Sequence, residues 1–183
     1  QSTCRVTTVQ CTSCVLAPPA NDLCTGAINI NCGQTIAGTT ASATTDVVSF
    51  CSTTLTTAPG VWYSFVGTGT NNILSLCGSS YDTKIGVFTG TCGALVCVVG
   101  NDDFGGLQSQ VTLPTTAGTT YYVLVTGFST ASGAYTLNRT CAPPANDICT
   151  GAVSINCGQT INGSTTGANT DAVASCGTSL NTA

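Results

Sequence analysis

The sequence predicts an all-β protein, an antiparallel β-sandwich of the jelly-roll or Greek-key type. Between residues 60 and 141, short stretches rich in β-branched and aromatic residues alternate with Gly, Asn, Asp, Ser and Pro. Long helical periodicity is missing from the chain. Thirteen cysteines in 183 residues further predict that disulfides staple the fold.

The expected strands follow one another at short intervals, as is typical of a sandwich. Ahead of them, Asn21 and Asp22 are expected to cap a short helical turn that leads to Cys24. In chain order the strands are Ala27–Ile30, Gln34–Thr39, Val61–Val66, Asn72–Leu76, Lys84–Thr89, Leu95–Gly100, Gln108–Leu113, Thr120–Thr126 and Ala134–Asn138.

Side-chain alternation indicates how two of these strands are buried. Val61, Tyr63 and Phe65 are two residues apart, so they should share the face that points into the core. Thr120–Thr126 is apolar on both faces. We therefore expect this strand to lie centrally, with one side in the core and the other beneath a loop or a partner.

A long internal repeat organises the chain. Residues 17–58, here called the first copy, recur without a gap as residues 142–183, the second copy. The period of about 125 residues has the size of a domain. We therefore predict a complete sandwich over residues 17–141 and an incomplete second repeat over residues 142–183. Residues 1–16 form an N-terminal arm or the tail of a preceding unit.

The composition excludes several classes of function. Charged residues make up 5% of the chain and histidine is absent, which leaves little material for acid–base catalysis, so we predict no enzyme. Three lysine and arginine residues and a net charge of −4 argue against binding to nucleic acid. No apolar run approaches the roughly 18 residues of a membrane span.

The cysteines predict an oxidising, extracellular location. Six of them fall within the complete repeat, and the pairs that we expect are Cys92–Cys97, Cys24–Cys32 and Cys51–Cys77, the last four residues having other connectivities open to them. The remaining seven are an odd number, so at least one is free or bonded to another chain. They are Cys4, Cys11, Cys14, Cys141, Cys149, Cys157 and Cys176.

The order of several motifs resembles that of the pre-peptidase C-terminal domain. These motifs are Gly60–Phe65, Tyr81–Phe88, Gly100–Asp103, Ala117–Gly127 and Ser132–Leu137. The opening Ala-Pro-Pro-Ala-Asn-Asp-x-Cys is similar to a cysteine-rich tandem variant in large secreted surface proteins of Bacteroidetes-type bacteria. The resemblance implies an exported, mostly non-catalytic accessory sandwich at a bacterial cell surface.

Asp82, Asn101, Asp102 and Asp103 are the main concentration of carboxylates and a neighbouring amide. Asp82 opens one expected strand and the other three follow a nearby one, so the fold can bring them to one end of the sandwich. Such oxygen atoms are ligands for Ca²⁺, and members of the resembled family sometimes bind calcium at such a loop. The alternative is an ordinary turn in which these side chains bond to their own backbone.

Two sequons predict glycans as modifications of the surface. Asn138-Arg-Thr and Asn162-Gly-Ser both match the N-glycosylation pattern, although short patterns of this kind are common by chance.

The incomplete repeat suggests the function. Part of a sandwich leaves backbone groups unpaired, so the second copy needs a partner. We expect it to pair with the N-terminal arm of the next chain, where Arg5–Gln10 has strand-like composition, giving a head-to-tail homopolymer that forms an extracellular fibre or surface array. A segment of a longer tandem protein is an equal alternative. A calcium-dependent adhesion or carbohydrate-binding module is the second hypothesis, and exposed Trp62 or Tyr81 near Asp82 would favour it.

Overall fold

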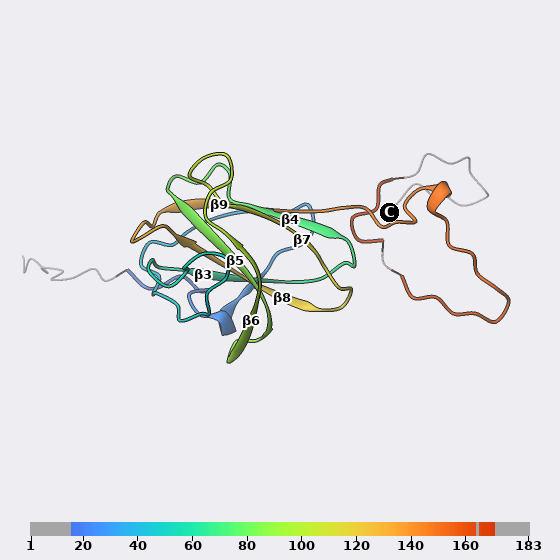
Figure 1. The fold of residues 1–183 in the computed structure, drawn as a ribbon, viewed down its shortest axis with the longest axis horizontal. Helices are drawn as coiled ribbons and strands as arrows, with labels where there is room; N and C mark the ends of the chain where they lie inside the picture. Colours follow the sequence, from blue (N-terminus) through green and yellow to red (C-terminus); the bar gives the residue numbers. More distant parts are fainter. Residues whose placement is uncertain (1–15, 164, 171–183) are drawn as a thin grey trace, which may run out of the picture.

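The computed structural model describes residues 16–163 and 165–170, and it shows two β-sheets packed face to face (Figure 1). One sheet has the order β1-β3-β8-β5-β6 and the other the order β2-β9-β4-β7. The pairing is antiparallel apart from β1, which runs parallel to β3. The predicted all-β sandwich is confirmed. The strands are β1 (Ile28–Asn29), β2 (Thr35–Thr39), β3 (Val61–Val66), β4 (Asn71–Ser75), β5 (Thr83–Thr91), β6 (Ala94–Asn101), β7 (Gln110–Pro114), β8 (Thr120–Gly127) and β9 (Ala134–Cys141).

The main core lies between the two sheets. Val61, Tyr63 and Phe65 all belong to it, as their alternation predicted. Tyr121, Val123 and Val125 of β8 join them from the neighbouring strand. Burial of these apolar side chains from both sheets is the main force that holds the sandwich together.

A second apolar cluster covers the outer face of the five-stranded sheet. Leu124 of β8, Trp62 of β3 and Phe88 of β5 pack there against Cys51 and Leu55, which belong to the segment between β2 and β3. The strand Thr120–Thr126 is thus central and has one side in the core and the other beneath a loop, as predicted.

The helical turn forms without the expected caps. A 3-10 helix, η1, spans Cys24–Gly26, and its N-cap residue is Leu23, with no side-chain hydrogen bond to the turn. Asn21 instead donates to the Trp62 carbonyl at 2.9 Å, and Asp22 accepts from the Thr44 amide at 2.6 Å. Both side chains tie the first copy to itself and to β3, because these long-range partners are the ones that the fold places beside them.

The disulfides differ from every predicted pair. They are Cys24–Cys92, Cys32–Cys141 and Cys51–Cys97. Cys92 lies at the tip of the β5–β6 hairpin, whereas Cys97 stands opposite Phe88, several pairs along the ladder, so these two cannot meet. Strand β1 separates Cys24 from Cys32. Cys77 follows β4, in the opposite sheet from the cluster around Cys51, and it is a free, exposed thiol.

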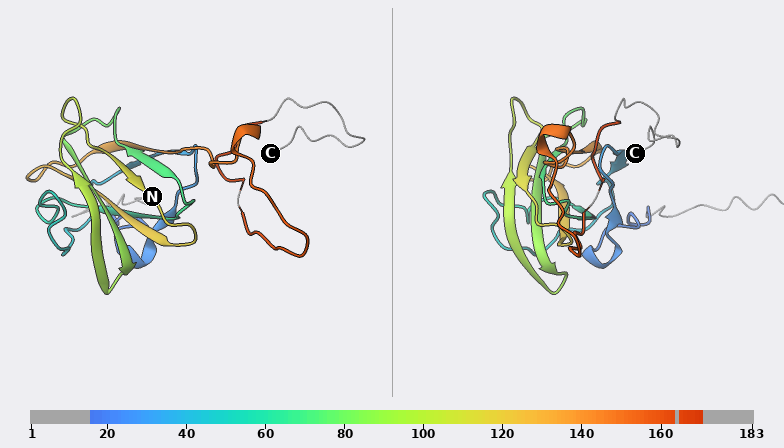
Figure 2. Two further views of the ribbon diagram at one scale, coloured as in Figure 1. Left: turned by 45° about the vertical axis from the view of Figure 1, so that its right-hand side comes forward. Right: turned by 90° about the vertical axis from the view of Figure 1, so that its right-hand side faces the viewer.

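The second copy lies beyond the end of β9 and extends away from the sandwich (Figures 1 and 2). Its described part contains a 3-10 helix, η2 (Cys149–Gly151), and no strand. The Ala142 amide donates to the Asn71 carbonyl at 2.7 Å and the Ala142 carbonyl accepts from Thr70 Oγ1 at 2.9 Å, which anchors the start of the second copy beside β4. No helix in the described ranges is long and apolar enough to cross a membrane.

Asp46 predicts a measurable pH dependence of stability. It accepts a hydrogen bond from the Trp62 indole at 2.7 Å, but its other oxygen is buried without a partner among the described residues. Burial raises the pKa of Asp46 to about 6, with a smaller contribution from the charge of Asp22. The folded protein therefore binds this proton more tightly than the unfolded chain, and the resulting stability is present below pH ~4 and lost as the pH rises through 6.

We expect Asp46→Asn to raise the free energy of unfolding at pH 8 by about 1–2 kcal/mol, a value reduced for solvent screening of this partly exposed group. The difference from the wild type should vanish below pH ~4. Urea denaturation of both proteins at pH 4, 6 and 8 measures it. Equal differences at the three pH values would contradict the assignment to Asp46.

Candidate functional site

The structure brings the three predicted carboxylates together at one end of the sandwich. Asp82 immediately precedes β5 and Asp102 follows β6, and the antiparallel pairing of these strands sets the two side by side. Carboxylate oxygens of Asp82, Asp102 and Asp103 all lie within 4.8 Å of one another. Asp82 and Asp102 are half-buried and Asp103 is exposed. The sequence prediction of this cluster was made from strand order, and the register explains why it forms.

Lys84 supplies a positive charge to this acidic cluster. Its ammonium lies 3.0 Å from Asp102 Oδ2, donates to Thr53 Oγ1 at 3.1 Å, and stands over the Phe128 ring at 4.8 Å from the centroid. Desolvation and the charges of Asp103 and Asp102 raise the pKa of Asp82, while Lys84 opposes the shift. One oxygen of Asp82 and one of Asp102 are buried without a hydrogen-bond partner in the described part of the chain. Such orphaned acceptors fit a hard cation, although the ammonium already occupies one side of the cluster.

Asn101 does not join the acidic cluster as a free ligand. Its side-chain oxygen accepts from the Gln110 amide at 3.0 Å and its nitrogen donates to the Asp103 carbonyl at 3.1 Å. These bonds hold the turn after β6 and connect it to β7. For Asn101 the ordinary turn is therefore the better description, because its polar atoms are committed to backbone.

The aromatic residues offer no platform for a sugar ring. Trp62 is 1% exposed and packs against Phe88, with ring centroids 5.9 Å apart. Tyr81 is half-buried, and its hydroxyl accepts from Thr40 Oγ1 at 3.3 Å. The feature that would favour carbohydrate binding, an exposed aromatic ring near Asp82, is thus not provided by either residue.

The two sequon asparagines occupy different surroundings. Asn138 is half-buried in β9, and its side-chain nitrogen donates to Thr35 Oγ1 at 2.7 Å across the β2–β9 pair. Asn162 is exposed in the second copy. Glycans on either residue stay a prediction.

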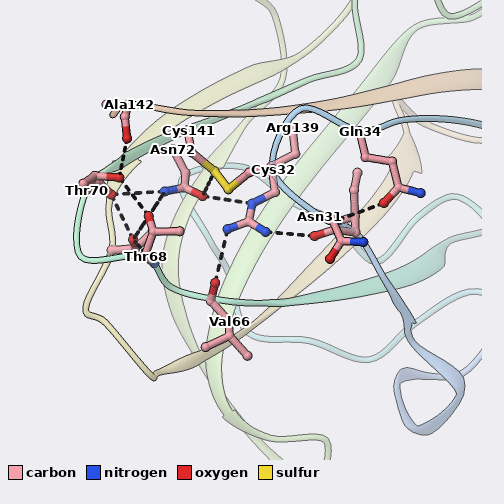
Figure 3. The surroundings of a disulfide bond; sticks show 12 residues. Asn31, Cys32, Gln34, Val66, Thr68, Thr70, Asn72, Arg139, Cys141 and Ala142 are labelled. Atoms are coloured by element: carbon pink, nitrogen blue, oxygen red, sulfur yellow. Dashed lines mark hydrogen bonds between the residues drawn. A yellow bond between two sulfur atoms is a disulfide. The ribbon is translucent and has the colours of Figure 1, made fainter. Parts of the chain in front are cut away.

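Sequence reasoning missed Arg139, which is 3% exposed in β9 at the end of the sandwich that faces the second copy. The guanidinium donates to Asn72 Oδ1 at 2.9 Å, to the Ile30 carbonyl at 2.8 Å and to the Val66 carbonyl at 3.2 Å (Figure 3). It also stacks 4.1 Å from the centre of the Phe65 ring. Its signal was only that it is one of three lysine and arginine residues in the chain.

Arg139 connects the first copy to the rest of the sandwich. Ile30 belongs to the first copy, whereas Val66 and Asn72 belong to β3 and β4. The Cys32–Cys141 disulfide lies beside it (Figure 3). Desolvation lowers the pKa of Arg139 to about 10, so it stays charged at neutral pH. A planar fork with several donors suits this role better than a lysine would.

All three disulfides make the same kind of connection. Each joins one cysteine of the first copy, Cys24, Cys32 or Cys51, to one cysteine of residues 60–141, which the second copy lacks. Their counterparts Cys149 and Cys157 are free and exposed. Cys4, Cys11, Cys14 and Cys176 lie outside the described residues. Cys141, which we had left for an interchain bond, is instead paired within the sandwich.

The two copies differ in burial at matched positions. Ile30 is 0% exposed in the main core, whereas its counterpart Ile155 is 65% exposed. Thr40 is likewise buried and Thr165 is exposed. Because each pair has the same residue type, the difference comes from the strands that cover the first copy and are missing beside the second.

The second copy nevertheless repeats the local conformation of the first. The Asn31 amide donates to Gln34 Oε1 at 2.8 Å, and the Asn156 amide donates to Gln159 Oε1 at 3.1 Å. The Asp147 carboxylate binds the Asn169 amide at 2.8 Å, as Asp22 binds that of Thr44. The helices η1 and η2 span corresponding residues. Local sequence is therefore enough to shape these turns without the sandwich.

The fold and its cysteines define a class of protein, a disulfide-stapled β-sandwich from an oxidising compartment outside the cytoplasm. Its fold is similar to that of the pre-peptidase C-terminal domain of a collagenase from Bacillus anthracis, with a TM-score of 0.44 and 14% identity over 62% of this chain and 94% of that one. It is also similar to a periplasmic inhibitor of g-type lysozyme from Aeromonas hydrophila, with a TM-score of 0.41 and 16% identity over 63% of this chain and 95% of that one. No family model and no curated protein matches the sequence.

Proposed function

We propose that this chain is a structural subunit of an extracellular fibre or surface array at a bacterial cell surface, assembled head to tail through its second copy. The observation that carries the proposal is the matched pair of Ile30, fully buried, and Ile155, 65% exposed. An isoleucine that the fold buries in one copy and leaves wet in the other marks a surface that lacks its cover.

The same end of the molecule presents further unsatisfied groups. Val153 and Ile161 are 55% and 42% exposed, and the thiols of Cys149 and Cys157 are free. A head-to-tail contact that covers such a surface does not close on itself, so it produces a filament. Exposed thiols at the contact can make the filament covalent.

The N-terminal arm alone is too small to be the cover that we expected. In the complete sandwich, β1 pairs with β3 in one sheet and β2 pairs with β9 in the other. The corresponding segments of the second copy therefore need neighbours in two different sheets. The arm, residues 1–15, lies outside the described residues, and a single strand from it supplies one of these neighbours at most.

Sedimentation velocity of the oxidised chain over a range of concentrations tests the proposal. We expect larger species that grow with concentration, and an Ile155→Asp variant that sediments as a monomer under the same conditions. A stable wild-type monomer at every concentration would contradict the fibre.

A calcium-dependent adhesion module is the second candidate, and the orphaned oxygens of Asp82 and Asp102 support it. Calorimetric titration with CaCl₂ should show one site with a Kd of about 10⁻⁴ to 10⁻³ M, the range of extracellular modules. Asp82→Asn should weaken binding at least tenfold, and Lys84→Gln should tighten it by removing the competing ammonium. No binding heat in the wild type would remove this candidate.

A further inference from the structure

We propose that the second copy of one chain binds where the first copy lies in the sandwich of another chain, and that it forms the same disulfides there. This inference rests on the proposed fibre and specifies the surface by which the subunits join. The occupant is a second copy of this chain, and its docking surface is made by β3, β9 and the outer face of the five-stranded sheet.

Identity at the buried positions carries the proposal. Every residue of the first copy that the structure buries has an identical counterpart in the second copy, whereas the differences fall at positions with exposed or half-buried side chains. The buried residues are Asn21, Asp22, Ile30, Thr40, Cys51, Leu55 and Ala58, and their counterparts are Asn146, Asp147, Ile155, Thr165, Cys176, Leu180 and Ala183. The surface that accepts the first copy therefore meets the same side chains in the second.

The backbone of the second copy also has the required shape before it docks. Gly33 and its counterpart Gly158 both have positive φ, 74° and 81°, in the turn that precedes β2 and its equivalent. The Gly26 amide bonds to the Leu23 carbonyl at 2.8 Å, and the Gly151 amide bonds to the Ile148 carbonyl at the same distance. Docking then has little local conformational entropy to remove, because the turns already exist.

The point of attachment directs the second copy to another chain. Asn21 of the first copy is bonded to Trp62, near the start of β3. Ala142 is held between Thr70 and Asn71, beyond the end of β3. The two copies thus begin at opposite ends of this strand, and the second copy points away from its own sandwich (Figure 2).

The disulfides make the exchange chemically explicit. The Cys149 thiolate of one chain attacks Cys92 Sγ of another chain, the Cys149–Cys92 bond forms and the Cys24–Cys92 bond breaks. The electron pair leaves on Cys24 Sγ, which takes up the proton that Cys149 lost. One thiol and one disulfide stand on each side, so the step needs no oxidant. Cys157 and the half-buried Cys32–Cys141 bond react in the same way.

The contacts that the first copy loses are the contacts that the second copy gains. The exchange is therefore close to balanced in free energy, and it depends on concentration and on the availability of thiols. A redox buffer that keeps exchange active should permit it, whereas blocking of the free thiols should stop it.

The test mixes unlabelled and ¹⁵N-labelled full-length chains in a glutathione redox buffer and maps disulfides by mass spectrometry. We expect peptides in which labelled Cys149 is joined to unlabelled Cys92, and labelled Cys157 to unlabelled Cys141. Ile155→Asp should reduce these peptides at least tenfold, because Ile155 takes the fully buried place of Ile30. Ile148→Asp is the matched control and should change them less than twofold, because Ile148 and its counterpart Leu23 are exposed alike, at 62% and 60%.

The outcomes separate this inference from the proposed function. Oligomers that contain only the bonds Cys24–Cys92, Cys32–Cys141 and Cys51–Cys97 would overturn the exchange and leave the fibre standing. Cys149–Cys92 peptides that never mix the two labels would show replacement within one chain and would also overturn it. A chain that stays monomeric and forms no mixed peptides would overturn both proposals.

Discussion

Ile30→Ala is expected to lower the free energy of unfolding of the sandwich by about 2–5 kcal/mol, whereas Ile155→Ala should leave it unchanged. Ile30 is fully buried in the core between the sheets, so truncation removes apolar contacts and opens a cavity. Ile155 has the same residue type at the same place in the repeat but is 65% exposed, so its truncation costs little. The pair isolates the effect of burial from that of local sequence.

Urea denaturation of dilute, oxidised protein, followed by the fluorescence of buried Trp62, measures both variants. Dilution keeps subunit contacts from contributing. Equal losses at the two positions would show that the second copy is covered in the monomer and would contradict the basis of the proposed fibre. No loss at Ile30 would contradict the assignment of the core.

Arg139→Met is expected to cost about 3–5 kcal/mol of folding free energy, although methionine fills much of the same volume. The substitution leaves the Ile30 carbonyl, the Val66 carbonyl and Asn72 Oδ1 without the donor that satisfies them. Buried acceptors that lose their donor cost about 1–3 kcal/mol each, and the losses at one site overlap. Stacking of the guanidinium on Phe65 is also lost.

Arg139→Lys should lie between the wild type and Arg139→Met, since an ammonium keeps the charge but cannot reach three acceptors with a planar fork. Thr140→Val, at the exposed neighbouring position of β9, should change stability by less than about 0.5 kcal/mol. The same denaturation measurement applies. A neutral Arg139→Met variant would show that these acceptors find other partners and that Arg139 does not tie the first copy to β3 and β4.

Much of the fold could be read from the sequence because its signals are local. The alternation of Val61–Val66 predicted both the bounds of β3 and the face that it buries. The apolar faces of Thr120–Thr126 predicted a central strand beneath a loop. Strand order also placed Asp82 close to Asp102, because neighbouring antiparallel strands bring the start of one beside the end of the next.

The pairing of cysteines could not be derived in this way. Short loops favoured Cys92–Cys97 and Cys24–Cys32, but each observed bond joins residues that lie 46 to 109 positions apart. The bonds follow the packing of the first copy across residues 60–141. The role of Arg139 was hidden for the same reason, since its partners Ile30, Val66 and Asn72 come from three separate segments.

The repeated segment shows the division directly. By itself the sequence determined the β-rich class, the strands, and the turns that the two copies share, because hydrogen bonds between near neighbours and side-chain periodicity act within a few residues. Only the tertiary structure decided that Ile30 is buried and Ile155 exposed, and that Cys24 is bonded while Cys149 is free. Burial and disulfide bonding need atoms from distant strands, and residues 60–141 provide those strands to the first copy alone.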